Sequence, residues 1–285
     1  MKQISLLLLS FLLLSNLSKG QEKPTVTTLS TKPFQLGIAT EIQSVQLSEK
    51  RTLNIYLPEG YDKDLKQTYP VIYLLDGSAN EDFIHIAGLV QYSTMIEVLP
   101  KSIVVGIANI DRKRDFTFPT TVAEDKKDFP TTGSSARFMS FIEKELQPYI
   151  NKQYRTNDSK TIIGQSLGGL LASEVLLKKP ELFNTYLIIS PSLWWDNESL
   201  LKAAPDLIKT LADKKINVYL SVGTEGKVME NDARQFAEVL KKSTDKNLNL
   251  IFNPMPAENH LTILHNSVYK AFDVLNPKKK SADAK

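Results

Sequence analysis

Short apolar runs alternate with longer amphipathic stretches along most of this chain. Six continuous apolar runs suit strands that are buried on both faces of a sheet, namely 71–75, 103–108, 161–163, 186–189, 218–222 and 248–252. Helix-like periodicity occupies the intervening stretches 81–98, 135–150, 167–178, 198–213, 230–242 and 261–275. Alternation of this kind predicts a parallel sheet with helices on both faces.

The chain before the first of these runs has a different pattern. Residues 42–47 and 51–57 read as two strands joined by a three-residue polar turn, and apolar and polar positions alternate in the second. This pattern predicts an antiparallel hairpin at an edge of the sheet, which brings the number of predicted strands to eight.

A Gly-x-Ser-x-Gly motif stands where the fifth predicted strand meets a helix. The motif is Gly164-Gln165-Ser166-Leu167-Gly168, with a further glycine at Gly169. Such a sharp strand-to-helix turn exposes a serine hydroxyl at the edge of a sheet, and its glycines leave room for a tight turn and close helix packing. The context therefore predicts that Ser166 is a nucleophile and that the fold is an α/β-hydrolase fold, an eight-stranded mostly parallel sheet with helices on both faces.

A serine hydroxyl needs an imidazole base, and this fold places it after the eighth strand. His260 stands in a polar loop at that place and is the predicted base. The other two histidines, His85 and His265, fall inside predicted helices and are interpreted as packing or surface residues.

The base in turn needs a carboxylate, which the fold places after the seventh strand. Glu225 follows that strand directly and is the preferred candidate. Asp232, further on in the next predicted helix, and Asp196, after the sixth strand, are the alternatives.

The oxyanion of an acyl-transfer intermediate needs two N–H donors. The amide of Leu167, directly after the serine, supplies the first. The second is expected from the turn after the third strand, where Leu74-Leu75-Asp76-Gly77-Ser78 runs into a glycine-bearing turn.

Two further features bear on the substrate. Trp194 and Trp195 follow the sixth strand and, with Asp76, are candidates for the pocket, although core packing explains the indoles equally well. Residues 109–136 form a long irregular stretch of the kind that often builds a lid or binding loop. Its basic triplet, 112–114, either meets an acidic substrate or is a solvated charge cluster.

The ends of the chain predict export. Residues 1–20 read as a signal peptide whose apolar run is too short for a membrane span, and 21–33 as a flexible segment before a single catalytic domain over 34–276. The tail 277–285 is rich in lysine and is interpreted as disordered. A periplasmic or secreted protein is expected.

Composition excludes several classes of function. Because the chain has no cysteine, disulfides, thiol nucleophiles and thiolate metal sites are excluded. Without the predicted signal peptide and tail, the 35 basic residues fall to 29 and the 32 acidic residues to 31, so no basic field favours nucleic acid. No cofactor or metal is expected, and the oligomeric state stays open.

The chain also resembles the putative-esterase (esterase D-like) branch of the α/β-hydrolases, and within it the ferric-siderophore esterases. The likeness covers most of the mature chain and rests on 57–61, 70–77, 141–150, 164–169 and the Ser-Pro-Ser-Leu-Trp-Trp run at 190–195. It implies that Ser78 supplies the second oxyanion amide, and a glutamate at Glu225 agrees with the mycolyltransferase members. Some siderophore esterases are described as using a Ser-His dyad, which would make Glu225 dispensable.

These observations predict a serine carboxylesterase acting on a small-molecule ester, either a siderophore lactone or an aryl or sugar ester. An acyltransferase with the same three residues is the nearest alternative. A hydrolase-like protein that only binds its ligand is a further one.

Overall fold

The computed structural model describes residues 26–210, 215–242 and 247–277. The predicted signal peptide and all of the predicted tail except Pro277 lie outside the described residues. From Leu36 onward the described residues form one compact unit, whereas residues 26–35 carry no helix or strand.

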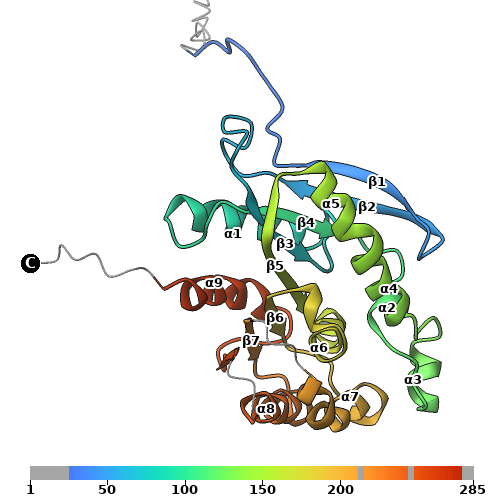
Figure 1. Cartoon of the computed structure of the whole chain (residues 1–285). Coiled ribbons are helices and arrows are strands. Elements are labelled where there is room, and N and C mark those ends of the chain that lie inside the picture. The colour runs from blue at the N-terminus through green and yellow to red at the C-terminus, as the bar shows by residue number, and fades with distance from the viewer. Residues whose placement is uncertain (1–25, 211–214, 243–246, 278–285) are drawn as a thin grey trace, which may run out of the picture. The chain divides into compact units, whose positions relative to one another are not determined.

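An eight-stranded sheet runs through this unit (Figure 1). Its strands are β1 (Ile38–Ser44), β2 (Glu49–Tyr56), β3 (Tyr69–Leu74), β4 (Ile103–Ile107), β5 (Thr156–Gln165), β6 (Thr185–Ile189), β7 (Ile216–Val222) and β8 (Leu248–Pro254). Their order across the sheet is β1-β2-β4-β3-β5-β6-β7-β8, and only the β1–β2 and β2–β4 pairs are antiparallel. The mostly parallel sheet and the edge hairpin are confirmed, but the first strand of the hairpin ends at Ser44 rather than at 47, so the turn lies at 45–48 and not at 48–50.

Helices cover both faces of the sheet, as Figure 1 shows. One face carries α1 (Phe83–Met95) and α9 (Ile263–Leu275). The other carries α4 (Ser135–Phe141), α5 (Gln147–Gln153), α6 (Leu167–Lys178), α7 (Trp195–Leu207) and α8 (Lys227–Lys241).

The central strands alternate between two cores, one under each helical layer. In β3, for example, Tyr73 packs on the α6 side, while Ile72 and Leu74 pack on the α1 side. All three side chains are at most 2% exposed. This is why the strands read as unbroken apolar runs: neither face of the sheet meets water.

Two expectations about helices need correction. The stretch 109–136, predicted to be irregular, contains two short helices, α2 (Arg112–Phe116) and α3 (Ala123–Asp128). The helix predicted over 135–150 is interrupted by a π-helical turn over Ile142–Leu146. Pro148 follows that turn and has no N–H to offer, so the helical ladder is broken there in any case.

The helix predicted at 198–213 also differs in its first turn. Asp196, Asn197 and Glu198 all have positive φ, so the chain makes a left-handed turn before the regular helix begins. Side-chain periodicity carries no information about such a turn, which depends on backbone conformation.

Candidate active site

The serine motif forms a strained turn between β5 and α6. Ser166 has φ 59° and ψ −119°, a conformation that non-glycine residues rarely adopt. A Cβ atom on Gly164 would lie 2.3 Å from the carbonyl oxygen of Gly168, so glycine at 164 is required by the close approach of strand and helix. The Gly-x-Ser-x-Gly motif thus adopts the nucleophile-elbow geometry. This geometry places the Ser166 side chain where the carboxyl ends of the parallel strands meet.

Glu225 and His260 meet at the same edge, each after its own strand. The Nδ1 atom of His260, in the loop that follows β8, lies 2.5 Å from Oε2 of Glu225, in the loop that follows β7. The other carboxylate oxygen accepts hydrogen bonds from Ser190 Oγ at 2.5 Å and from the Gly223 N–H at 2.9 Å.

These contacts determine the charge of Glu225. Burial acts to raise the pKa of the carboxyl, but the hydrogen bonds from His260, Ser190 and Gly223 together hold that pKa below its ordinary value. An ionised carboxylate accepts the proton of Nδ1, which leaves Nε2 of the neutral imidazole free to accept another.

The Ser166 hydroxyl contacts a second serine. Its Oγ lies 3.3 Å from Oγ of Ser192, whose backbone N–H also donates to the carbonyl of Ser166. Within the described part of the chain, Ser192 is the hydrogen-bond partner of Ser166 Oγ, and His260 is not.

Two backbone N–H groups beside the elbow have no partner. In the ranges that the structure describes, neither the Leu167 nor the Ser78 amide donates a hydrogen bond. The two segments lie close together, since a Cβ on Gly168 would be 3.4 Å from a carboxylate oxygen of Asp76. Uncommitted donors beside a serine hydroxyl are what a developing oxyanion requires.

An open cavity of about 430 Å³ contains the serine and the histidine together. Its lining is Ser166, Ser192, Trp194, Thr224, Glu225, Met229, Asn259 and His260. The sequence therefore indicated four of these residues, and it missed Ser192, Thr224, Met229 and Asn259. Ser192 lies within the run that carries the family resemblance, and Thr224 and Asn259 adjoin the predicted Glu225 and His260, whereas Met229 had no signal.

Only one of the three predicted pocket residues lines the cavity. Trp194 lines the cavity, but Trp195 is fully buried and its indole N–H donates to the carbonyl of Phe118 at 2.9 Å. Asp76 is also buried and does not line the cavity; it accepts two hydrogen bonds from Arg112, at 2.6 and 2.9 Å, and one from Asn109 at 2.6 Å. Packing, rather than substrate contact, accounts for Trp195.

The basic triplet 112–114 is engaged within the protein. Arg112 also donates to the Gln165 carbonyl at 3.1 Å and so ties the stretch 109–136 to the elbow. Arg114 pairs with Asp115 and Glu49, and the same two carboxylates bind Arg51, which is 1% exposed. Arg112 and Arg114 are therefore paired with carboxylates of the protein, while the exposed Lys113 donates to the Asp128 carbonyl at 3.0 Å.

The alternative acids lie in other surroundings. Asp232 is buried within α8, and one of its oxygens has no hydrogen-bond partner in the described structure. Burial, with a smaller contribution from Glu198, raises the pKa of Asp232 to about 6. Asp196 is bonded to Thr120 and Thr121.

The two remaining histidines pair with each other. The rings of His85 and His265 stack with their centroids 3.5 Å apart, and neither lines the cavity. Among the described residues, no group of three or more His, Asp or Glu side chains is arranged to hold a metal ion.

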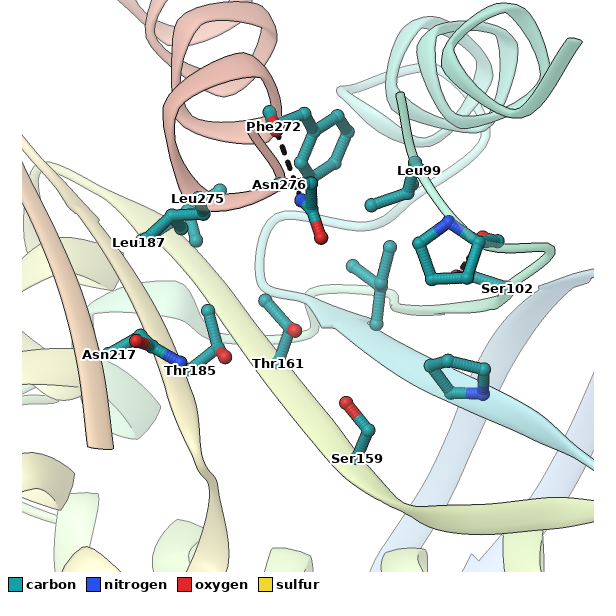
Figure 2. A pocket seen from close by; sticks show the side chains of 13 residues that line it. Leu99, Ser102, Ser159, Thr161, Thr185, Leu187, Asn217, Phe272, Leu275 and Asn276 are labelled. Atoms are coloured by element: carbon teal, nitrogen blue, oxygen red, sulfur yellow. Dashed lines mark hydrogen bonds between the residues drawn. The ribbon is translucent and has the colours of Figure 1, made fainter. Parts of the chain in front are cut away.

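A second cavity, of about 180 Å³, lies at the opposite edge of the sheet (Figure 2). Figure 2 shows Ser159 and Thr161 of β5, Thr185 of β6 and Phe272 of α9 around this cavity. None of its lining residues titrates, so it offers no base or carboxylate. The cavity at Ser166, by contrast, contains both a histidine and a carboxylate.

Comparison with known proteins agrees with this geometry. Residues 44–261 match the family model described as "Putative esterase". The chain belongs to this esterase family. The ferri-bacillibactin esterase BesA of Bacillus subtilis is 30% identical to the chain over 240 residues, covering 76% of this chain and 82% of the relative.

Solved structures of the family superpose on the same fold. An IroE-like serine hydrolase from Shewanella oneidensis has a TM-score of 0.77 and 32% identity, covering 84% of this chain and 80% of that one. The BES protein from Bacillus cereus has a TM-score of 0.77 and 27% identity over 88% of this chain and 99% of its own. The predicted α/β-hydrolase fold and esterase family are confirmed, and the chain is a serine hydrolase of that family. In the described residues no helix is both long and apolar enough to cross a bilayer.

Proposed function

We propose that this esterase cleaves carboxylic esters with Ser166 as nucleophile, His260 as base and Glu225 as the carboxylate that orients His260. The observation that carries the proposal is the 2.5 Å contact between His260 Nδ1 and Glu225, in a cavity shared with the elbow serine. An orienting carboxylate fixes the imidazole tautomer and stabilises the imidazolium that forms during the reaction.

The first half of the reaction forms an acyl-enzyme. Ser166 Oγ turns from Ser192 toward His260 Nε2, gives up its proton and attacks the ester carbonyl carbon. The carbonyl oxygen becomes an oxyanion that accepts hydrogen bonds from the amides of Leu167 and Ser78. The carbon–oxygen bond to the alcohol then breaks, and His260 returns the proton to the departing oxygen.

The second half releases the acid. Water takes the place of the alcohol, gives a proton to His260 and attacks the acyl carbon. The bond to Ser166 Oγ breaks as His260 protonates that oxygen, so the enzyme is restored and the net change is one ester hydrolysed. The open cavity admits water, the acceptor that hydrolysis requires.

We further propose a siderophore ester, most directly a catecholate lactone, as the substrate, and a periplasmic or secreted location. Relatives named ferri-bacillibactin esterase and siderophore enterobactin esterase support this class. The indole of Trp194 and the thioether of Met229 line the cavity and offer an apolar surface to an aromatic ring.

The test is the detection of the acyl-enzyme. A fluorophosphonate should label Ser166, and rapid mixing with a p-nitrophenyl ester whose acyl-enzyme is hydrolysed more slowly than it forms should give a burst of p-nitrophenol equal to the enzyme concentration. Ser166→Ala should abolish both and keep the thermal transition. Retention of a tenth of the turnover would exclude Ser166 as the nucleophile. Rates on enterobactin, feruloyl and acetyl-sugar esters then rank the substrate classes.

A further inference from the structure

The peptide bond between Gly77 and Ser78 is held by a side chain from another strand. Its N–H belongs to Ser78, which donates no hydrogen bond in the part of the chain described. Its carbonyl accepts a hydrogen bond from Asn54 Nδ2 at 2.8 Å. A trans peptide is planar, so its C=O and N–H point in opposite directions, and fixing one fixes the other.

We propose that Asn54 is a positioning residue that aims the Ser78 N–H at the oxyanion. This inference rests on the proposed function, because Ser78 matters only if an oxyanion forms beside Ser166. Asn54 itself does not line the cavity, so it would act through the peptide rather than on the substrate.

Asn54 is placed for this role by the register of the sheet. It lies in the interior of β2, is 6% exposed, and pairs with Gly106 of β4. Gly106 leaves the space that the turn occupies: a Cβ there would lie 2.5 Å from the Gly77 carbonyl oxygen. The turn therefore rests on β4, and the Asn54 amide reaches the carbonyl of Gly77 from the next strand.

The hydrogen bond from Asn54 is needed because residue 77 is glycine. A Cβ at this position would lie 2.4 Å from Cα of Gly106, so no other residue fits without a backbone shift. Glycine, however, permits the large dihedral change that turns a peptide over. The Gly77 N–H donates to the Ile107 carbonyl at 3.0 Å, but this bond holds the preceding peptide and not the one that follows.

A flipped peptide would harm the reaction in two ways. The Ser78 N–H would leave the site, and the Gly77 carbonyl would present its partial negative charge there. Loss of one oxyanion donor typically lowers the rate by about 10² to 10³. The hydrogen bond from Asn54 opposes the peptide flip at little cost in conformational entropy, since it uses a side chain that is already fixed inside a sheet.

The test compares Asn54→Leu, which keeps the number and branching of side-chain heavy atoms and removes the donor, with the smaller Asn54→Ala, which also removes it. Each should lower kcat on a p-nitrophenyl ester by about 10-fold to 10³-fold and leave KM within about threefold. Asn184→Leu is the matched control, because Asn184 also donates to a backbone carbonyl, that of Asp158 at 2.7 Å, in a segment that contributes no residue to the cavity at Ser166. It should lower only thermal stability.

A thionoester provides a readout that stability alone would not move. The oxyanion donors favour oxygen over sulfur, so the wild type should prefer an ester to its thionoester strongly, and both Asn54 variants should lose most of that preference. Folded variants that keep the wild-type kcat and preference overturn the inference, even though Ser166 is still labelled by the fluorophosphonate. A wild type that is neither labelled nor active overturns the proposed function and, with it, this role of Asn54.

Discussion

One oxygen of the Glu225 carboxylate binds His260, and the other accepts two further hydrogen bonds. Ser190 and Gly223 fix the second oxygen, so the carboxylate cannot turn away from the imidazole without losing two hydrogen bonds. A carboxylate held in this way transmits its orientation to the ring.

Glu225→Gln should therefore lower kcat/KM by about 10² or more with little change of fold, since the shape is kept and the charge is lost. Asp232→Asn is the control and should leave turnover on the same p-nitrophenyl ester within about twofold. The reverse result would make Asp232 the acid, and no effect from either would favour a Ser-His dyad.

Asp232→Asn should instead change stability. Its pKa of about 6 lies above the ordinary 3.8, so ionising Asp232 costs the folded state more than the unfolded state. Wild-type stability should fall as the pH rises from about 4 to about 6. The variant should be more stable by about 1–3 kcal/mol above pH 6, and the gap should close below about pH 4.

Thermal or urea unfolding at several pH values measures this gap. Equal stability of the two proteins at neutral pH would show that Asp232 ionises without cost in the folded state.

Arg112→Ala should lower both the free energy of unfolding and turnover. It removes the bidentate partner of the buried Asp76 carboxylate, and it removes the hydrogen bond that connects the stretch 109–136 to the elbow. The expected loss is about 1–3 kcal/mol in unfolding and about tenfold or more in kcat. Arg112→Lys should fall in between, since a lysine cannot bond both oxygens in the same geometry. Lys113→Ala, in the same triplet, should have no effect on kcat.

The two tryptophans should behave differently. Trp194→Ala should raise KM for aryl esters about tenfold and leave acetyl esters less affected, because the indole lines the cavity. Trp195→Ala should destabilise the fold by about 3–5 kcal/mol, as expected for a fully buried aromatic side chain. Similar KM shifts for both variants would contradict this division.

The sequence predicted the sheet well because its central strands are buried on both faces and therefore unbroken in hydrophobicity. It predicted β5 only at 161–163, since the strand begins at Thr156 with polar, partly exposed residues. The loops after β5, β7 and β8 were predictable because this fold assigns them chemistry.

Residues whose role depends on the packing of distant parts of the chain could not be predicted. Asn54 is an ordinary polar position in an alternating strand, and its target in the turn after β3 becomes visible only when the register is known. Trp194 and Trp195 are adjacent and chemically identical, so only the backbone turn at 196–198 and the packing beneath it distinguish them.

The buried charges behind α2 have a consequence for mutation. Arg51 and Asp115 are almost completely excluded from water, and Arg114 and Glu49 extend the pairing. Replacing one partner would leave an uncompensated charge in the interior, which costs far more than an exposed ion pair contributes. These residues are therefore expected to tolerate joint replacement better than single replacement, although none of them lines the cavity at Ser166.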